Sequence, residues 1–354
     1  MKKTVLCVLL FALLTWLVPL GSLFLPTGLA APDPGVWQLD GGQAPAPTAA
    51  PGSMPSGSGQ SQAQDPDEPA GQAGPLLIWD EGAQQVLTVP VRDYLIGAVA
   101  SEMPVDWPDE ALKAQAVAAH TYALYQKAQA TAAGQEYYFS ADPARRQNFM
   151  TSEVLQSYWG QAYDANYARV SALVDEVLDM LVLYEGQPAA TCYHAINCGH
   201  TEASQNVWEQ SLPYLQGVDS PLDLTADGYE ATVTYTSQQM YDALSRNLAG
   251  VDLSGSPSSW FSEPTYTDAG YVDVLQVGGV QVRGTVLRTA LGLRSACFSI
   301  AYDQGVFTVT THGYGHGVGL SQWGARALAL TGKSCAEILA FYYPGTQLSG
   351  GSAV

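Results

Sequence analysis

The sequence predicts a mixed α+β fold, with one domain of interspersed helices and hairpins over residues 76–348. Two observations predict it. Segments with helical periodicity alternate irregularly with short strand-like segments, without the regular β-α-β order that is typical of parallel sheets. Hydrophobic residues make up 47% of the 354 residues, which is enough for a substantial core. An apolar leader and a Pro/Gly-rich tether precede the domain.

The leader occupies residues 1–30. Two lysines precede an apolar run from Thr4 to Leu25, and about 20 apolar residues suffice to cross a bilayer. Two interpretations stay open. A signal peptide would be cleaved after Gly28-Leu29-Ala30, whereas the length of the run favours an uncleaved membrane helix. Both place the domain outside the cytoplasm, and the uncleaved helix makes the chain a single-pass protein of the cell membrane.

The tether occupies residues 31–75. It contains nine Pro and eight Gly and has no Lys or Arg. This composition buries too little apolar surface to offset the entropy lost on ordering, so we expect disorder. A flexible chain of this length spans roughly 35–40 Å root-mean-square, which keeps a domain attached to a membrane but away from it.

The charge of the chain argues against several kinds of partner. With 33 Asp and Glu against 14 Lys and Arg, the formal charge is −19. Nucleic-acid binding requires clustered Lys and Arg, so we expect no nucleic acid partner. Only 13% of the residues are charged, so much of the surface must be neutral and polar. Such a surface is compatible with a neutral, hydroxyl-rich ligand.

Local signals place the elements of the domain. One helix begins at Pro108, a residue favoured in a first turn, and the last helix has Ser334 and Glu337 in a capping box. Gly278-Gly279 forms a two-residue hairpin turn. We expect helices over residues 91–103, 108–133, 170–178, 238–249 and 335–343. We expect a strand over residues 230–236 and three hairpins, which pair 181–184 with 189–193, 271–277 with 280–282, and 298–302 with 306–311.

Four cysteines follow the leader, and an even number permits disulfides in an oxidising compartment. They are Cys192, Cys198, Cys297 and Cys335. Three pairings are open. The first two also lie near His194 and His200 in the sequence, but their spacing matches none of the usual zinc patterns. We therefore expect disulfides or free thiols, with no metal and no other cofactor.

Glu102 is the sharpest candidate for chemistry. It lies where Pro104 disfavours continuation of the first helix. Its neighbours are apolar or small, and no Lys or Arg lies nearer in the sequence than Arg92 and Lys113. A carboxyl in an apolar pocket has a raised pKa and donates a proton near neutral pH. The alternative is a helix-end carboxylate that faces solvent.

A second candidate is the Gly-rich segment 312–319 with the residues that follow it. Its four alternating glycines cost ordering entropy unless the backbone adopts unusual angles or approaches a ligand closely. The segment matches neither the phosphate-binding loop nor the helical zinc-protease motif, which makes its two histidines weak candidates for metal ligands. A purely structural loop is one alternative. The other is a bend that lines a cleft with His316, Ser321, Gln322 and Trp323.

Several blocks follow one another in order between residues 88 and 348. They are Val91–Pro104, Ala111–Ala119, Tyr193-His194, Thr201-Glu202, Val207-Trp208, Leu291–Ser295, Gly315–Ala325 and Tyr342–Thr346. Together they resemble the stage II sporulation protein D family. Several motifs in order are more specific than any one of them alone.

This resemblance implies a membrane-anchored lytic transglycosylase that cleaves peptidoglycan glycan strands during forespore engulfment. It implies two kinds of partner, a peptide-trimming amidase or endopeptidase and a membrane scaffold of the engulfment machinery. Glu102 would act first as general acid and then as general base, so that a 1,6-anhydro ring forms and no second carboxylate is needed. The substrate-binding candidates are His120, His194, His200, His316, Ser321, Gln322 and Trp323.

Three features depart from the family pattern. His120 and His200 replace an Arg and a Lys of the family, and the loop over 140–152 lacks the Cys and His that bind zinc in some clostridial relatives. The two replacements keep a second hypothesis open, a non-catalytic wall-binding module or amidase enhancer. In that hypothesis Glu102 holds glycan or contacts an amidase.

Overall fold

A computed structural model of the protein describes residues 74–208 and 210–350. The predicted leader over residues 1–30 lies outside the described residues, and so does the predicted tether over 31–75 apart from its last two residues. Within the described ranges, no helix has the length and apolar character needed to cross a membrane.

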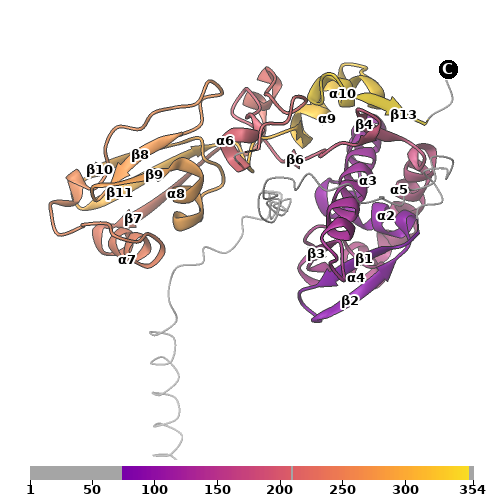
Figure 1. Ribbon diagram of the computed structural model, residues 1–354, viewed down its shortest axis with the longest axis horizontal. Helices are drawn as coiled ribbons and strands as arrows, with labels where there is room; N and C mark the ends of the chain where they lie inside the picture. Colours follow the sequence, from indigo (N-terminus) through magenta and orange to yellow (C-terminus); the bar gives the residue numbers. More distant parts are fainter. Residues whose placement is uncertain (1–73, 209, 351–354) are drawn as a thin grey trace, which may run out of the picture. The chain divides into compact units, whose positions relative to one another are not determined.

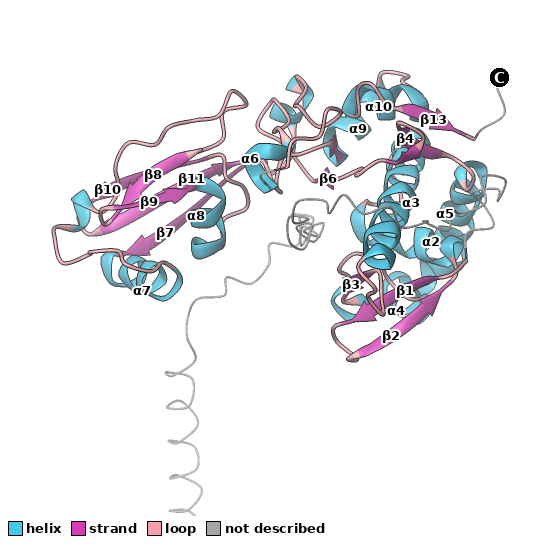
Figure 2. Cartoon of the chain, viewed as in Figure 1, coloured by secondary structure: helices cyan, strands magenta, loops and turns pink. Residues whose placement is uncertain are grey.

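The described residues form helices interspersed with small sheets of two or three strands, which confirms the α+β class (Figure 2). The helices are α2 (Val91–Glu102), α3 (Asp109–Ala132), α4 (Ser152–Trp159), α5 (Tyr163–Val177), α6 (Ser204–Trp208), α7 (Ser237–Asn247), α8 (Gly284–Leu291), α9 (Gln322–Leu330) and α10 (Cys335–Tyr342). The strands are β1 (Leu76–Asp80), β2 (Gln85–Val89), β3 (Phe139–Ala141), β4 (Leu181–Tyr184), β5 (Gln187–Pro188), β6 (Tyr193–His194), β7 (Glu230–Thr236), β8 (Val274–Val277), β9 (Val280–Arg283), β10 (Phe298–Asp303), β11 (Val306–His312), β12 (Leu320–Ser321) and β13 (Gln347–Ser349).

The first of two large hydrophobic clusters surrounds α3. This helix contacts α2, α5 and the C-terminal helices α9 and α10, which are far from it in the sequence (Figure 1). Ala111, Ala114 and Ala118 are fully buried, and their small side chains allow the neighbouring helices to approach closely. Gly97 of α2 serves the same purpose, because a Cβ atom there would lie 2.1 Å from the carbonyl oxygen of Met150.

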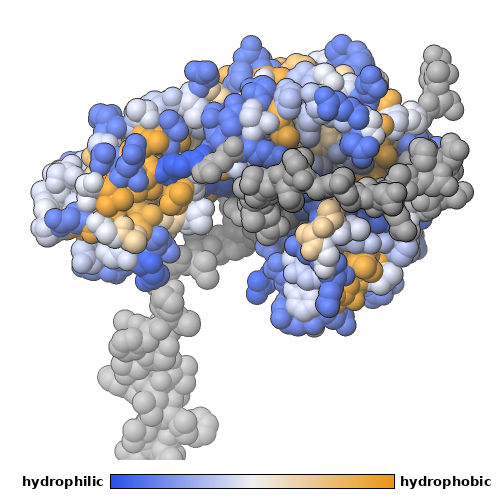
Figure 3. Space-filling model, viewed as in Figure 1, coloured by the Kyte–Doolittle hydropathy of each residue, from blue (hydrophilic) through white to orange (hydrophobic). Residues whose placement is uncertain are grey.

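The second cluster is built from the sheet β10-β11-β7, the hairpin β8-β9 and the helices α7 and α8. Both predicted hairpins of this region are confirmed. The turn residues Gly278 and Gly279 have φ values of 52° and 79°, which is the left-handed conformation that a tight hairpin turn requires. The most continuous hydrophobic area on the face shown in Figure 3 lies over the elements of this cluster.

One predicted strand pairing is wrong. We expected residues 189–193 to pair back onto 181–184, but the strand that pairs there is the short β5, which ends at Pro188. The other neighbour of β4 in this sheet is β13. Proline has no N–H to continue the ladder. Tyr193 and His194 instead form β6, which runs parallel to β12 with Leu320 and Ser321 as partners. This pairing joins two segments that carry site candidates.

Candidate active site

Glu102 is the last residue of α2, and only 6% of it is exposed. The following Met103 is extended, with φ −133° and ψ 144°, as expected for a residue that precedes proline. The solvent-facing alternative for Glu102 is therefore wrong. The end of α2 therefore buries the side-chain carboxyl group of its last residue, Glu102.

A glutamine from another helix contacts Glu102, and a second glutamine contacts the first. Gln322 Nε2 donates a hydrogen bond of 2.9 Å to Glu102 Oε2, and Gln115 Oε1 lies 3.4 Å from the same nitrogen. Burial raises the pKa of Glu102 to about 7, although the hydrogen bond from Gln322 partly opposes the shift. A substantial fraction of the Glu102 carboxyl groups is therefore protonated at neutral pH.

Ser321 and Asp223 hold Gln322 in place. Ser321 is the N-cap of α9: its Oγ accepts a hydrogen bond of 3.1 Å from the N–H of Gly324. The same hydroxyl donates to Asp223 Oδ1. Asp223 is fully buried and also accepts from the backbone N–H of Asn197 (3.0 Å) and from Ser220 Oγ (2.7 Å). Burial raises the pKa of Asp223 to about 6.

An aromatic pair lies on the segments that flank Glu102 and Gln322. Trp107 and Trp323 meet edge to face, with ring centroids 6.0 Å apart. The guanidinium of Arg326 lies 4.7 Å from the Trp323 ring centroid and 5.7 Å from that of Trp107. These residues bring aromatic surface and a positive charge to the neighbourhood of the buried carboxyl group.

The structure brings two of the four candidate histidines together. The rings of His194 and His316 lie 5.7 Å apart between centroids, and Trp208 lies 4.9 Å from His316. His194 Nδ1 is 3.1 Å from the Val318 carbonyl oxygen, and His316 Nδ1 accepts from the Val318 N–H at 3.1 Å. Burial lowers the pKa of His194 to about 4 and holds that of His316 well below its ordinary value, so both rings are neutral at pH 7.

The other two histidines lie apart from this pair. His120 is fully buried on α3 beside Leu178, and burial lowers its pKa to about 4. His200 is partly exposed, with Nδ1 2.7 Å from the Thr201 carbonyl oxygen and Nε2 3.8 Å from Asp219. Neither has a contact with Glu102 among the described residues.

The four cysteines of the domain are free thiols in the structure. Cys192 and Cys335 are buried separately, whereas Cys198 and Cys297 hydrogen-bond to each other. Cys198 also donates to the Ala269 carbonyl oxygen at 3.2 Å. In the described ranges, no three His, Cys, Asp or Glu side chains are grouped so as to hold a metal ion.

Comparisons with known proteins decide the family. A family model described as "Stage II sporulation protein" matches residues 80–184. The chain is 34% identical over 280 residues to "Stage II sporulation protein D" of Bacillus subtilis, covering 78% of this chain and 80% of that protein. It is 33% identical over 273 residues to the protein of the same name in Bacillus amyloliquefaciens, covering 77% and 78%. The chain belongs to the stage II sporulation protein D family. It is also 28% identical over 313 residues to "Amidase enhancer" of Bacillus subtilis, covering 72% of this chain and 40% of that protein.

The stage II sporulation protein match includes Glu102 and Gln115 but ends before Gln322. The fold supplies this third member, across 220 residues of sequence. Sequence reasoning selected Glu102 and Gln322 separately. It missed Gln115 because nothing local distinguishes this residue within an alanine-rich helix. It missed Asp223 because the chain has many acidic residues and no local signal sets this one apart.

The raised pKa of Glu102 makes the stability of the protein depend on pH. Glu102 titrates near 7 in the folded chain, against 4.5 ordinarily, and so the folded state binds more protons than the unfolded state between these values. Stability is therefore lost as pH rises from 4.5 to 7, by on the order of 3 kcal/mol from this group. Thermal unfolding at pH 5 and pH 8 should show Glu102→Gln gaining stability over the wild-type chain at pH 8. Equal pH slopes for both chains would contradict the assignment.

Proposed function

We propose that this protein is a lytic transglycosylase that cleaves peptidoglycan glycan strands between N-acetylmuramic acid and N-acetylglucosamine. The single observation that carries the proposal is the buried Glu102 carboxyl group, which has a pKa of about 7 and is held by Gln322. A group that titrates near the working pH can both give and take a proton. Among the described residues, no second carboxylate contributes to the shift of its pKa.

Gln322 determines which oxygen of Glu102 reacts. Its Nε2 group donates to Oε2, so the acidic proton resides on Oε1, which has no other hydrogen-bond partner among the described residues. Oε1–H protonates the glycosidic oxygen. The bond from that oxygen to C1 of the muramic residue breaks, and the electron pair leaves with the oxygen. C1 then carries an oxocarbenium-like positive charge.

The second half of the reaction returns the proton. The Glu102 carboxylate takes the proton from the C6 hydroxyl of the same muramic residue, and that oxygen bonds to C1. The products are a 1,6-anhydromuramic end and a free 4-hydroxyl on the N-acetylglucosamine, with Glu102 protonated again. Because the nucleophile belongs to the substrate, one carboxyl group performs both steps.

The names of the relatives support a setting for this activity. Two of the relatives, which match this chain over most of their own length, are named stage II sporulation protein D. A further relative is named amidase enhancer. These names favour a role in sporulation, and we propose that the enzyme acts in forespore engulfment, at the cell membrane with its catalytic domain outside the cytoplasm. Its partners there would be an amidase or endopeptidase that trims stem peptides and a membrane scaffold.

The second candidate function is a glycan-binding or amidase-enhancing module without activity of its own, which the amidase-enhancer relative favours. Purified full-length chain incubated with isolated glycan strands separates the two. We expect the strands to become shorter with time, as measured by chromatography. Strands of unchanged length that sediment with the protein would favour the binding module instead.

A further inference from the structure

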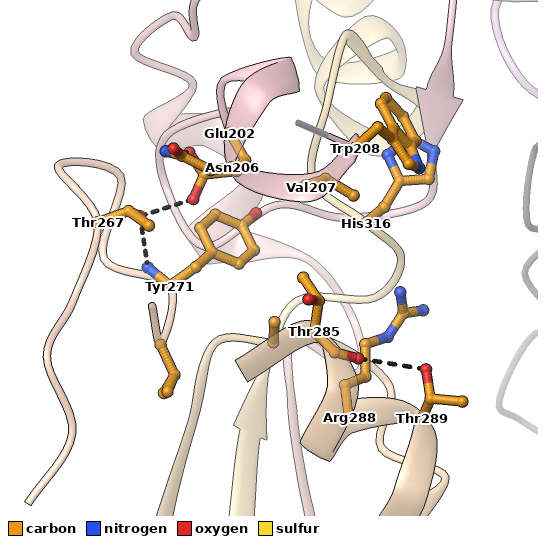
Figure 4. A pocket seen from close by; sticks show the side chains of 12 residues that line it. Glu202, Asn206, Val207, Trp208, Thr267, Tyr271, Thr285, Arg288, Thr289 and His316 are labelled. Atoms are coloured by element: carbon orange, nitrogen blue, oxygen red, sulfur yellow. Dashed lines mark hydrogen bonds between the residues drawn. The ribbon is translucent and has the colours of Figure 1, made fainter. Parts of the chain in front are cut away.

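A cavity of about 190 Å³ lies beside His316 (Figure 4). The residues that line it are far from Glu102 in the sequence. It receives side chains from α6, α8, the loop before β8 and the Gly-rich loop. Its polar and aromatic lining includes Glu202, Trp208, Thr267, Arg288, Thr289 and His316. Only His316 and Trp208 of these residues belong to the candidate active site described above.

Arg288 is the unexplained group of this cavity. Its Nε donates to the Leu293 carbonyl oxygen at 3.3 Å, and its two terminal NH₂ groups have no hydrogen-bond or ion-pair partner among the described residues. Other arginines of the chain, Arg92 and Arg169, pair with Asp175 and Asp109. Arg294 and Arg326 place their guanidinium groups over the rings of Tyr314 and Trp323, whereas Arg288 lines the cavity. Four N–H donors remain available there.

The acid in the same cavity does not neutralise Arg288. Glu202 is buried, and its oxygens accept hydrogen bonds from the backbone N–H of Ala203 (2.7 Å), from Asn206 Nδ2 (2.8 Å) and from Thr267 Oγ1 (2.6 Å). These three donors stabilise the carboxylate where it lies. His316 is neutral. Among the described residues Glu202 forms no ion pair with Arg288, and the guanidinium keeps its donors free for a ligand.

The remaining walls favour a sugar over a simple ion. Trp208 offers an aromatic face next to His316, and Thr285 and Thr289 bring hydroxyl groups from the same helix as Arg288 (Figure 4). Aromatic faces stack on sugar rings, and a planar guanidinium binds a carboxylate through two parallel hydrogen bonds. The combination selects a ring that carries a carboxylate.

We propose that this cavity binds the lactyl carboxylate of an N-acetylmuramic acid residue through Arg288, with the sugar ring against Trp208. The inference rests on the proposed function for its ligand, since the lactyl group is the anionic group of the bare glycan backbone. The cavity is linked to the candidate active site through His316, whose ring packs on that of His194, the neighbour of Tyr193 in β6.

The test is binding of three monosaccharides to the full chain, measured by calorimetry. They are N-acetylmuramic acid, its methyl ester and N-acetylglucosamine. We expect the wild-type chain to bind the acid at least about tenfold more tightly than the ester. Arg288→Gln should lose this preference, and Arg288→Lys should keep part of it. Arg246→Gln, on exposed α7 surface, is the matched control and should keep all of it.

Two results would overturn the proposal: equal binding of acid and ester by the wild-type chain, or an undiminished preference in a folded Arg288→Gln. If Arg288→Gln does not fold, the ester comparison and Arg288→Lys decide. The same titration with Glu102→Gln separates this inference from the proposed function. A preference that persists in a chain without cleavage activity supports the cavity independently of catalysis.

Discussion

Replacing Glu102 by Gln abolishes glycan cleavage, with an expected loss of about a thousandfold or more in rate. Glutamine keeps the size and the hydrogen-bonding length of the side chain but has no proton to give to the glycosidic oxygen. Because the buried carboxyl group is replaced by a neutral group, the variant should fold at least as well as the wild-type chain. The rate is followed as the shortening of isolated glycan strands.

Asp93→Asn is the matched control, since Asp93 lies on the same helix with its side chain exposed. It should retain wild-type activity. Glycan pull-down should be retained in both variants. Residual cleavage by Glu102→Gln within about tenfold of the wild-type rate would be too fast for loss of the general acid. Such a rate would mean that Glu102 is not the general acid of the reaction.

Asp223→Ala gives the largest expected loss of stability. Its carboxylate accepts hydrogen bonds from the Asn197 N–H, Ser220 Oγ and Ser321 Oγ, all of them buried. Alanine removes the acceptor that these three donors share and opens a small cavity, at a cost of roughly 3–5 kcal/mol in the free energy of unfolding. Thermal denaturation should show a melting temperature lower by about 10 °C. Activity should fall too, because Ser321 caps the helix that presents Gln322.

Asp219→Ala is the control for Asp223→Ala. The Asp219 side chain is 92% exposed and lies 3.8 Å from a partly exposed histidine, a contact of the kind that contributes little. Its melting temperature should stay within about 2 °C of the wild-type value. If Asp219→Ala and Asp223→Ala have the same melting temperature, the hydrogen bonds of Asp223 do not hold the site in place.

Local chemistry explains which parts of the fold the sequence could predict. The first helices were expected over residues 91–103 and 108–133 and run over 91–102 and 109–132, because Pro104 and Pro108 mark their ends. The capping box of Ser334 and Glu337 is present in the structure. These signals act within a few residues, so a single sequence displays them.

The assembly of the site could not be predicted in the same way. Glu102 meets Gln322 because a two-residue parallel pair, β6 with β12, joins distant segments, and so short a pair leaves no periodic pattern. The role of Asp223 depends on Ser321, 98 residues later. Arg288 was likewise missed, since its distinguishing feature is a missing carboxylate partner.

The chemical nature of the new glycan ends tests the central claim most directly. Mass spectrometry of strands cut by the full-length wild-type chain should find 1,6-anhydromuramic ends, each lighter by one water than a reducing end. That result means that the C6 hydroxyl attacks C1, as a mechanism with one reacting carboxyl group requires. Reducing ends would mean that water attacks C1. That result would contradict the mechanism in which one carboxyl group performs both steps.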